Sequence, residues 1–338
     1  MVAAEVAEER LLSAARQGDE SAFGELVGAH ERRLTAHCYR MLGSVHDAED
    51  AVQETLLRAW RALDRFEERS SIHTWLYAIS SNVCLRMLER RPARLLPLEA
   101  APPAASGEEP GRPLAESVWV EACPNGLLDL DDVSPDARYS RRESVELAFV
   151  AALQHLPPLQ RAALILRDVL SYSARETATI LDTSVPAANS ALQRARKTLD
   201  ERRPEVSQQA TLRALGDRRV DALVARYAQA MEDGDVATVV GLLTEDAAWS
   251  MPPDSTWYRG EALEVFLREW PLPLRWRHMP TSVNGQPAVL CYLWDEGEGV
   301  FEAHALDVLT LQGPRIAEVT AFLSLPVLQR LGLPMALG

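Results

Sequence analysis

A short polar stretch, HDAEDAVQETLLRAW at residues 46–60, gathers imidazole, carboxylate and carboxamide side chains that can bind metals or basic partners. On a helix, Asp50, Glu54 and Arg58 follow one another at i,i+4 spacing, where acidic and basic groups pair in solvent. Such pairs contribute only about 0.3–0.5 kcal/mol each, so a solvated face accounts for the charges. A metal site is disfavoured, because helical sites generally need ligands from a second helix and Arg61 shares this face. We expect no metal and no cofactor.

The same stretch also places apolar side chains among its charges. Asp47, Asp50 and Glu54 are expected on the solvent side of the helix, opposite the apolar stripe. Leu57 falls in the middle of this polar side, and Trp60 falls at its border. An apolar anchor surrounded by carboxylates is typical of a protein-binding face. The stretch therefore predicts a docking surface for a basic protein partner.

Residues 173–199 have the layout of a helix-turn-helix. Ser184 is placed to cap the second helix, and Pro186 falls in its first turn, where a missing N–H has no consequence. A buried stripe is expected from the apolar residues at helical spacing, which are Ala188, Leu192, Ala195 and Leu199. The outward face then carries Asn189, Gln193, Arg196 and Lys197. These side chains can contact base edges and phosphates in a DNA major groove.

The 338-residue length and uneven composition predict several domains. Apolar periodicity indicates helices in residues 10–91 and 140–203, separated by a proline-rich, acidic linker at 92–139. Within that linker WVEACPNGLLDLDD, residues 119–132, is too apolar for a plain spacer, so part of the linker is expected to dock on a domain. A connector at 204–219 leads to residues 220–338, where helices precede an antiparallel sheet, as in an α+β domain.

The net charge of −14 argues superficially against nucleic acid, but the two helical segments are the least acidic long ones. No apolar run is long enough for a membrane span, and the N-terminus lacks a secretion signal, so we expect a cytoplasmic protein. The four cysteines, which show no metal or disulfide spacing, are expected to be buried and reduced.

Four polar residues of the C-terminal domain are candidate acids or bases: His278, Asp295, His304 and Asp307. His304 and Asp307 are three residues apart on one predicted strand, which places them on opposite faces. Single polar residues in an apolar domain are more often satisfied core groups, so we expect no catalytic residues.

Two long strings carry a family resemblance. They are AFGELV...HCYRMLGSVHDAEDAVQETLLRAWRALDRFEERSSIHTWLYAISSNVCL and LQHLPPLQRAALILRDVLSYSARETATILDTSVPAANSALQRARKTL. They resemble conserved regions 2 and 4 of an extracytoplasmic-function (ECF) sigma factor of the sigma-70 family. Residues 220–338 resemble a SnoaL-like domain, the cone-shaped fold of polyketide cyclases and ketosteroid isomerases. The implied fold class is multidomain: two all-α helical domains followed by an α+β SnoaL-like cone-shaped barrel.

The resemblance implies an RNA polymerase sigma factor that binds core RNA polymerase and promoter DNA, with no membrane partner. The residues expected to bind the clamp helices of the polymerase largest subunit are Asp50, Gln53, Glu54, Leu57 and Trp60. Those expected at the minus-10 DNA are Arg69, Ser70, Ser71, His73, Trp75, Asn82 and Arg86. Those expected at the minus-35 DNA are Pro186, Ala187, Asn189, Ser190, Gln193, Arg194, Arg196 and Lys197. Trp75 can equally be a core residue, and Asn82 a helix-surface residue.

The SnoaL-like domain is expected to modulate sigma activity and to offer a site for a small-molecule ligand or a protein partner. Two other interpretations stay open at this point. A self-contained helix-turn-helix repressor with a ligand-binding domain would bind its operator tightly without polymerase. An enzyme that uses the SnoaL-like cavity would turn over a hydrophobic ring substrate.

Overall fold

The structure is a computed structural model that describes all residues except 1, 92, 114–117, 129–141 and 203–205. The chain forms two compact units. The first, here called the helical unit, comprises Met1–Pro92, Leu127–Asp129 and Ala152–Arg203. The second, the sheet unit, comprises Ala93–Gly126, Leu130–Ala151 and Pro204–Gly338.

The first half of the helical unit contains α1 (Val2–Arg16), α2 (Glu20–Gly28), α3 (Glu31–Leu42), α4 (Val45–Ala62), the short 3-10 helix η1 (Leu63–Arg65) and α5 (Ile72–Leu88). Gly43 ends α3 with a left-handed φ of 68°, and Ser44 then caps α4 by accepting a hydrogen bond from the Asp47 N–H. A left-handed residue is typical of helix ends, and here it lets the chain reverse into α4. The bundle core includes Leu34, Tyr39, Met41 and Leu76, all completely buried.

The second half contains α9 (Pro158–Leu164), the π-helical segment η4 (Ile165–Val169), α10 (Ala174–Ile180) and α11 (Val185–Asp200), while α8 (Leu147–Gln154) runs across the boundary between the units. Ser184 caps α11 by accepting from the Ala187 N–H, as predicted. The predicted stripe is buried in full, and Ala191 joins it. The helix-turn-helix is therefore confirmed.

A buried arginine joins the two halves of the helical unit. Arg161 of α9 is 2% exposed and donates to the Gln154 side chain (2.6 Å) and to the carbonyls of Gln154 (2.9 Å), Leu156 (3.2 Å) and Met41. Met41 belongs to α3, so one guanidinium satisfies backbone groups from both halves. Burial lowers the pKa of Arg161 to about 10, which leaves the side chain charged at neutral pH.

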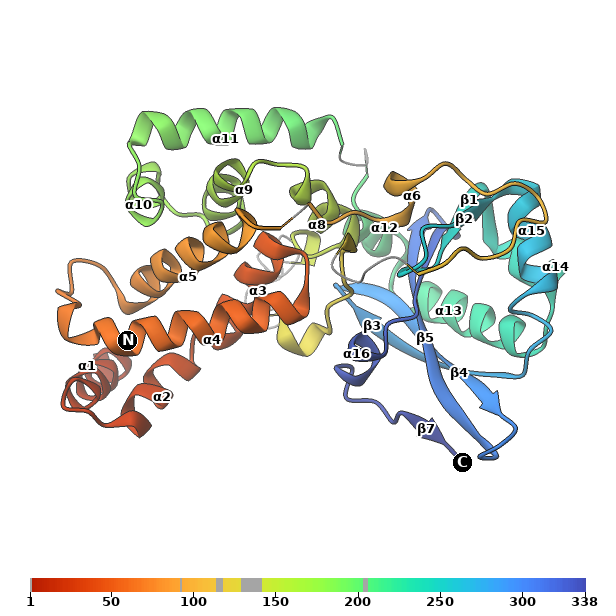
Figure 1. Ribbon diagram of the computed structural model, residues 1–338, viewed down its shortest axis with the longest axis horizontal. Coiled ribbons are helices and arrows are strands. Elements are labelled where there is room, and N and C mark those ends of the chain that lie inside the picture. Colours follow the sequence, from red (N-terminus) through yellow and green to blue (C-terminus); the bar gives the residue numbers. More distant parts are fainter. Residues whose placement is uncertain (1, 92, 114–117, 129–141, 203–205) are drawn as a thin grey trace. The chain divides into compact units, whose positions relative to one another are not determined.

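The sheet unit contains a seven-stranded sheet in the order β2-β1-β6-β5-β4-β3, with β7 also paired to β5. β1 and β6 run parallel, and the other pairs run antiparallel. Figure 1 shows α13 lying along the sheet. The strands are β1 (Leu243–Ser250), β2 (Trp257–Arg259), β3 (Trp276–Val283), β4 (Gln286–Asp295), β5 (Val300–Gln312), β6 (Arg315–Phe322) and β7 (Ala336–Leu337). The helices are α12 (Gln208–Leu215), α13 (Asp217–Glu232), α14 (Val236–Leu242), α15 (Gly260–Glu269) and α16 (Leu325–Gln329).

The α+β class and the β4–β5 hairpin agree with the prediction, but β2 and β3 were not predicted. β3 reads WRHMPTSV, whose arginine and proline obscure any strand-like alternation. It is the outermost strand of the sheet, where a proline is tolerated.

Part of the linker between the two helical segments belongs to the sheet unit. It contains α6 (Pro97–Ala100) and the 3-10 helix η3 (Asn125–Leu127). The Trp119 indole donates to the Pro253 carbonyl (2.9 Å), and the Cys123 N–H donates to the Asn284 side chain (2.7 Å). Residues 119–125 thus lie on the sheet unit, as expected for a segment too apolar for a spacer, while residues 129–132 lie outside the described part.

Candidate functional site

The exposed face of α4 combines carboxylates with one apolar side chain. Asp50 and Gln53 are exposed, Glu54 is partly exposed, and Leu57 is 44% exposed among them. The Arg58 guanidinium donates to Glu54 (2.6 Å), which forms part of the predicted ion-pair ladder. Trp60 at the border is half-buried, and its ring lies 5.0 Å from that of Phe23. This geometry offers an apolar anchor beside a negative surface.

Asp47 does not belong to this face, contrary to the prediction. Its side chain is 4% exposed and forms an ion pair with Arg91, just beyond the end of α5. Asp47 lies in the first turn of α4, where a carboxylate is favoured by the helix dipole and can turn toward a neighbouring chain segment. Helical periodicity alone does not account for such a long-range ion pair.

The predicted minus-10 residues lie along α5 and the loop before it. Four of them are exposed, and three are partly buried and have partners within the chain. Arg69, Ser70 and Arg86 are exposed. Ser71 is also exposed, but its hydroxyl caps α5 by accepting from the Thr74 N–H. The other three residues have partners within the chain: the Trp75 ring packs against Phe66 in a tilted arrangement with centroids 4.8 Å apart, Asn82 donates to the Ala78 carbonyl (2.9 Å), and His73 contacts Tyr172.

Tyr172, between η4 and α10, covers part of α5. Its hydroxyl lies 3.0 Å from Nδ1 of His73, and its ring lies 5.7 Å from that of Tyr77. Burial, together with the nearby His30 and Arg33, lowers the pKa of His73 to about 4. The imidazole is therefore neutral at pH 7 and shares a hydrogen bond with the tyrosine. Tyr172 was not predicted as a functional residue, because the contact joins residues 99 positions apart.

The predicted minus-35 residues lie together on the outer face of α11. All are exposed except Ala187, which is partly exposed. Arg196 is held by a two-pronged pair with Asp168, in which Nε and Nη2 donate over 2.9 and 2.7 Å. Arg167, Asn189, Gln193, Arg196 and Lys197 border a shallow groove along this face. Amide and guanidinium groups side by side on one exposed helix are suited to reading bases and binding phosphates.

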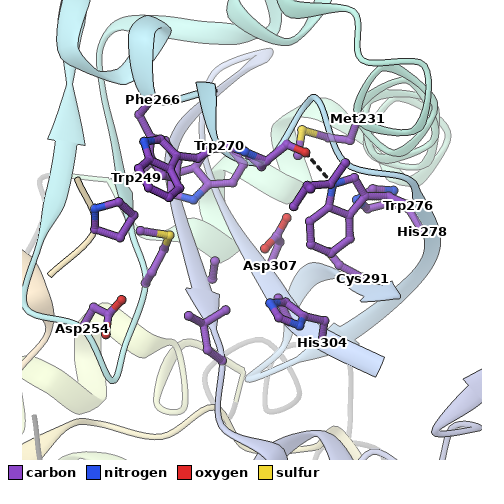
Figure 2. Close-up of a pocket in the computed structure, with 17 residues that line it drawn as sticks. Met231, Trp249, Asp254, Phe266, Trp270, Trp276, His278, Cys291, His304 and Asp307 are labelled. Carbon is purple, nitrogen blue, oxygen red and sulfur yellow. Dashed lines mark hydrogen bonds between the residues drawn. The ribbon is translucent and has the colours of Figure 1, made fainter. Parts of the chain in front are cut away.

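The sheet unit encloses a cavity of about 200 Å³. Figure 2 shows its lining, in which Trp249, Phe266, Trp270 and Trp276 supply aromatic walls. His278, His304 and Asp307 all line it, whereas Asp295 lies in the β4–β5 turn and accepts from the backbone N–H groups of Gly297 (2.7 Å) and Glu298 (2.8 Å).

The prediction that His304 and Asp307 lie on opposite faces is wrong. Cys291 pairs with Ala305 while the next residue, Tyr292, pairs with Ala303, so His304 is an extra residue in β5. Such a β-bulge interrupts the alternation of side chains, and the sequence gives no signal for it. Both side chains consequently face the cavity.

Among the residues that the structure describes, no group of three or more His, Cys, Asp or Glu side chains is arranged to hold a metal ion. None of the described helices is both long and apolar enough to cross a lipid bilayer. The four cysteines are buried, and none forms a disulfide among the described residues.

Family models match both halves of the helical region. The Sigma-70 region 2 model matches residues 26–93, and the Sigma-70, region 4 model matches residues 146–199. These matches indicate a transcription initiation factor of the sigma-70 type.

Similar proteins narrow this class. The ECF RNA polymerase sigma factor SigG of Mycobacterium tuberculosis is 43% identical over 328 residues, covering 95% of this chain and 86% of SigG. ECF RNA polymerase sigma factor SigW of Bacillus subtilis is 29% identical over 187 residues, covering 54% of this chain and 90% of SigW. The crystal structure of the Mycobacterium tuberculosis extracytoplasmic function sigma factor SigJ matches with a TM-score of 0.56 at 23% identity, covering 91% of this chain and 98% of SigJ. The chain belongs to the ECF RNA polymerase sigma factors.

The structure confirms the predicted fold class of two helical regions followed by an α+β domain. The family membership confirms the function: the protein directs core RNA polymerase to promoter DNA and initiates transcription. The interpretation as a self-contained repressor is set aside. Sigma factors are initiation factors and not enzymes.

Proposed function

We propose that this sigma factor contacts core polymerase through the α4 face that contains Asp50, Gln53, Glu54, Leu57 and Trp60. The observation that supports it most directly is the 44% exposure of Leu57 between partly or fully exposed carboxylates. A basic helical clamp on the polymerase would complement both the charge and the apolar anchor. The site of action is then the cytoplasm, where core polymerase transcribes.

Promoter reading is assigned to two surfaces of the helical unit. The outer face of α11 supplies Asn189 and Gln193 for base edges, and Arg194, Arg196 and Lys197 for phosphates. The α5 region supplies Arg69, Ser70, Ser71 and Arg86 for the minus-10 strand, with His73, Trp75 and Asn82 becoming available once their intramolecular partners release them. Single-strand reading calls for stacking rings and small polar groups of this kind.

The SnoaL-like domain is assigned a modulating and non-catalytic role. The linker that separates the two promoter-reading regions is bonded to this domain at Trp119 and Cys123. Holding or releasing that linker changes the reach between the two regions. The buried carboxyl of Asp307 already accepts a hydrogen bond from the Tyr227 hydroxyl (2.7 Å), as expected of a satisfied core group.

The polymerase contact can be tested with a double charge reversal, Asp50→Arg with Glu54→Arg. Like charges facing the clamp should weaken core binding on the order of 100-fold or more and abolish run-off transcription. The matched control reverses two exposed carboxylates of β1, Glu245→Arg with Asp246→Arg, which changes the net charge equally. If the α4 variant binds core polymerase as tightly as this control, the assignment of α4 is wrong.

A further inference from the structure

The cavity of the sheet unit contains polar groups that its own fold leaves without partners. Both ring nitrogens of His278 and Oδ1 of Asp254 are buried without a hydrogen-bond partner among the described residues. The His278 side chain is 1% exposed, and its Nδ1 lies 4.0 Å from Glu232, beyond hydrogen-bonding distance. Buried polar groups are nearly always bonded, so orphaned atoms on a cavity wall point to a missing partner. None of these groups takes part in polymerase or promoter binding.

The lining residues divide the cavity into two ends. Figure 2 shows Asp307, Cys291, His278 and His304 gathered together, with Trp249 and Phe266 away from them. Strand pairing supports this grouping, because His278 pairs with Cys291 and Cys291 with Ala305. A ligand inside would therefore find His278, His304 and Asp307 together with the Trp276 ring at one end, and Trp249, Phe266 and the Asp254 carboxyl away from them.

Charge and size restrict that ligand. Among the described residues that line the cavity there is no Arg or Lys, whereas the carboxyls of Asp254 and Asp307 both face it. An anion would thus enter without a positive partner, at a high desolvation cost. The volume of about 200 Å³ is somewhat larger than the roughly 150 Å³ apolar cavity that holds a benzene ring. One or two fused rings fit such a space.

We propose that this cavity binds a small, neutral aromatic compound of one or two rings that carries one hydroxyl or N–H group. The rings lie between Trp249, Phe266 and Trp276, and the donor group meets Asp307 or an unprotonated nitrogen of His278. Trp276 can act as a wall because its own N–H is satisfied by the Pro271 carbonyl (2.6 Å). The exposed side chains of Trp270 and Leu274 form the entrance.

One wall of the cavity comes from the linker between the promoter-reading regions. Pro110 lines the cavity within a segment, residues 101–113, that we call the strap. Trp257 fastens the strap twice, because its indole donates to the Ala101 carbonyl (2.7 Å) and its carbonyl accepts from the Ala104 N–H (2.8 Å). The Tyr258 hydroxyl donates to the Glu108 carbonyl (3.0 Å).

The strap packs closely enough to respond to what fills the cavity. A Cβ added at Gly111 would lie 2.3 Å from Oγ1 of Thr256, so a larger residue there would require the Thr256 side chain to move. The Tyr258 ring stacks on Phe266 at 4.2 Å, and Phe266 is itself a cavity wall. A bound ring would touch both Phe266 and Pro110. Ligand and strap attachment should therefore stabilise each other, since thermodynamic coupling is reciprocal. The consequence of this coupling for transcription rests on the modulating role proposed above.

The ligand class can be tested on the full chain at pH 7 with three probes of similar shape: 2-naphthol, naphthalene and 2-naphthoate. Calorimetric titration should show 2-naphthol binding at least about tenfold more tightly than naphthalene, because only the alcohol donates a hydrogen bond. The anionic 2-naphthoate should not bind. Failure of all three probes to bind, or tighter binding of 2-naphthoate, would overturn the proposal.

Two variants locate the probe. Asp307→Asn keeps the residue's size, and it should reduce the preference for 2-naphthol over naphthalene severalfold. Ala305→Leu adds bulk at the cavity wall and should abolish binding of both. Ala237→Leu, at an exposed position of α14 away from the cavity lining, is the matched control and should bind like wild type. Circular dichroism melting identifies any variant that fails to fold, and unchanged binding by a folded Ala305→Leu protein would contradict the location.

The coupling to the strap has a separate readout. Hydrogen exchange should slow in the strap when 2-naphthol binds, and Pro110→Gly should weaken both the protection and the affinity. Binding without strap protection would refute the coupling. If 2-naphthol binds and protects the strap but run-off transcription with core polymerase is unchanged, the cavity site stands and the modulating role fails.

Discussion

Two surfaces of the helical unit are assigned to DNA, and they differ in how available they are. On α11 the side chains for base edges and phosphates face outward; Asp168 is bonded to Arg196, and Asp200 borders the same groove. On α5, His73 lies beneath Tyr172 and Trp75 lies on Phe66. The minus-35 surface on α11 can therefore contact DNA without rearrangement, whereas part of the minus-10 surface on α5 is covered by other residues of the chain. We infer that opening α5 is a separate step that core polymerase binding must provide.

The largest expected effect comes from the arginine that joins the two halves. Arg161→Leu removes a buried guanidinium that serves four acceptors, and it should lower the free energy of unfolding of the helical unit by about 3 kcal/mol. Hydrogen exchange in α3 and α9 under mild denaturant measures this loss. Arg194→Leu, at an exposed site on α11, should change it by no more than about 0.5 kcal/mol. Equal effects would mean that Arg161 does not hold the halves together.

The second effect concerns the minus-35 surface on α11. Asn189→Ala and Gln193→Ala should each reduce the free energy of promoter binding by about 1–3 kcal/mol through one base pair of the minus-35 element, and by little through the other base pairs. Arg194→Ala should instead weaken all promoters alike and reduce the salt dependence of binding by about one phosphate contact. Holoenzyme binding to promoters with single substitutions in the minus-35 element separates the two patterns. Base-specific loss in Arg194→Ala would reverse the assignment of roles.

The contrast between α11 and α5 also marks the limit of prediction from sequence. The cap Ser184 and the buried stripe of α11 follow from local spacing, and the structure has both. The composition of the α4 face was predictable for the same reason, apart from Asp47, whose partner Arg91 lies 44 residues along the chain. Periodicity describes one helix at a time, so it identifies exposed faces well.

The contact of Tyr172 with α5, here called the cover, depends on interactions that helical periodicity does not encode. The same is true of the cavity in the sheet unit. Tyr172 reaches His73 only because the second helical region packs back on the first. The cavity needs the bulge at His304, the edge strand that carries His278 and the strap residue Pro110 at once. Each of these comes from a different segment, and a single inserted residue in β5 reversed the predicted facing of His304.

A third, smaller effect should come from Tyr172→Phe. This change keeps the ring over α5 and removes only the hydroxyl that bonds His73, so it should weaken the cover by about 1 kcal/mol. Amide exchange along α5 should become severalfold faster, while α11 stays unchanged. Tyr258→Phe removes a similar hydroxyl bond in the sheet unit and serves as the matched control. A cover made only of ring packing would give no difference between the two variants.

The smallest expected effect is a pH dependence of the same cover. Burial lowers the pKa of His73 from 6.5 to about 4, so the covered form holds the imidazole neutral while an uncovered form takes up a proton below pH 6.5. The stabilisation is thus fully present above pH 6.5 and is lost as the pH falls toward 4. Because His73 remains partly exposed, we expect less than a tenfold change between pH 7 and pH 5.

The ratio of amide exchange in α5 to that in α11 is the suitable measure of this effect, because the intrinsic pH dependence of exchange cancels in it. No histidine lies on α11, so its protection should follow pH only through intrinsic exchange. His73→Gln should flatten the ratio, whereas His30→Gln should make its change with pH smaller, because it raises the pKa of His73 in the covered form toward 6.5. A ratio that rises on acidification in the His73→Gln protein as in wild type would show that another group senses the pH. His73 would then not account for the pH dependence of the contacts over α5.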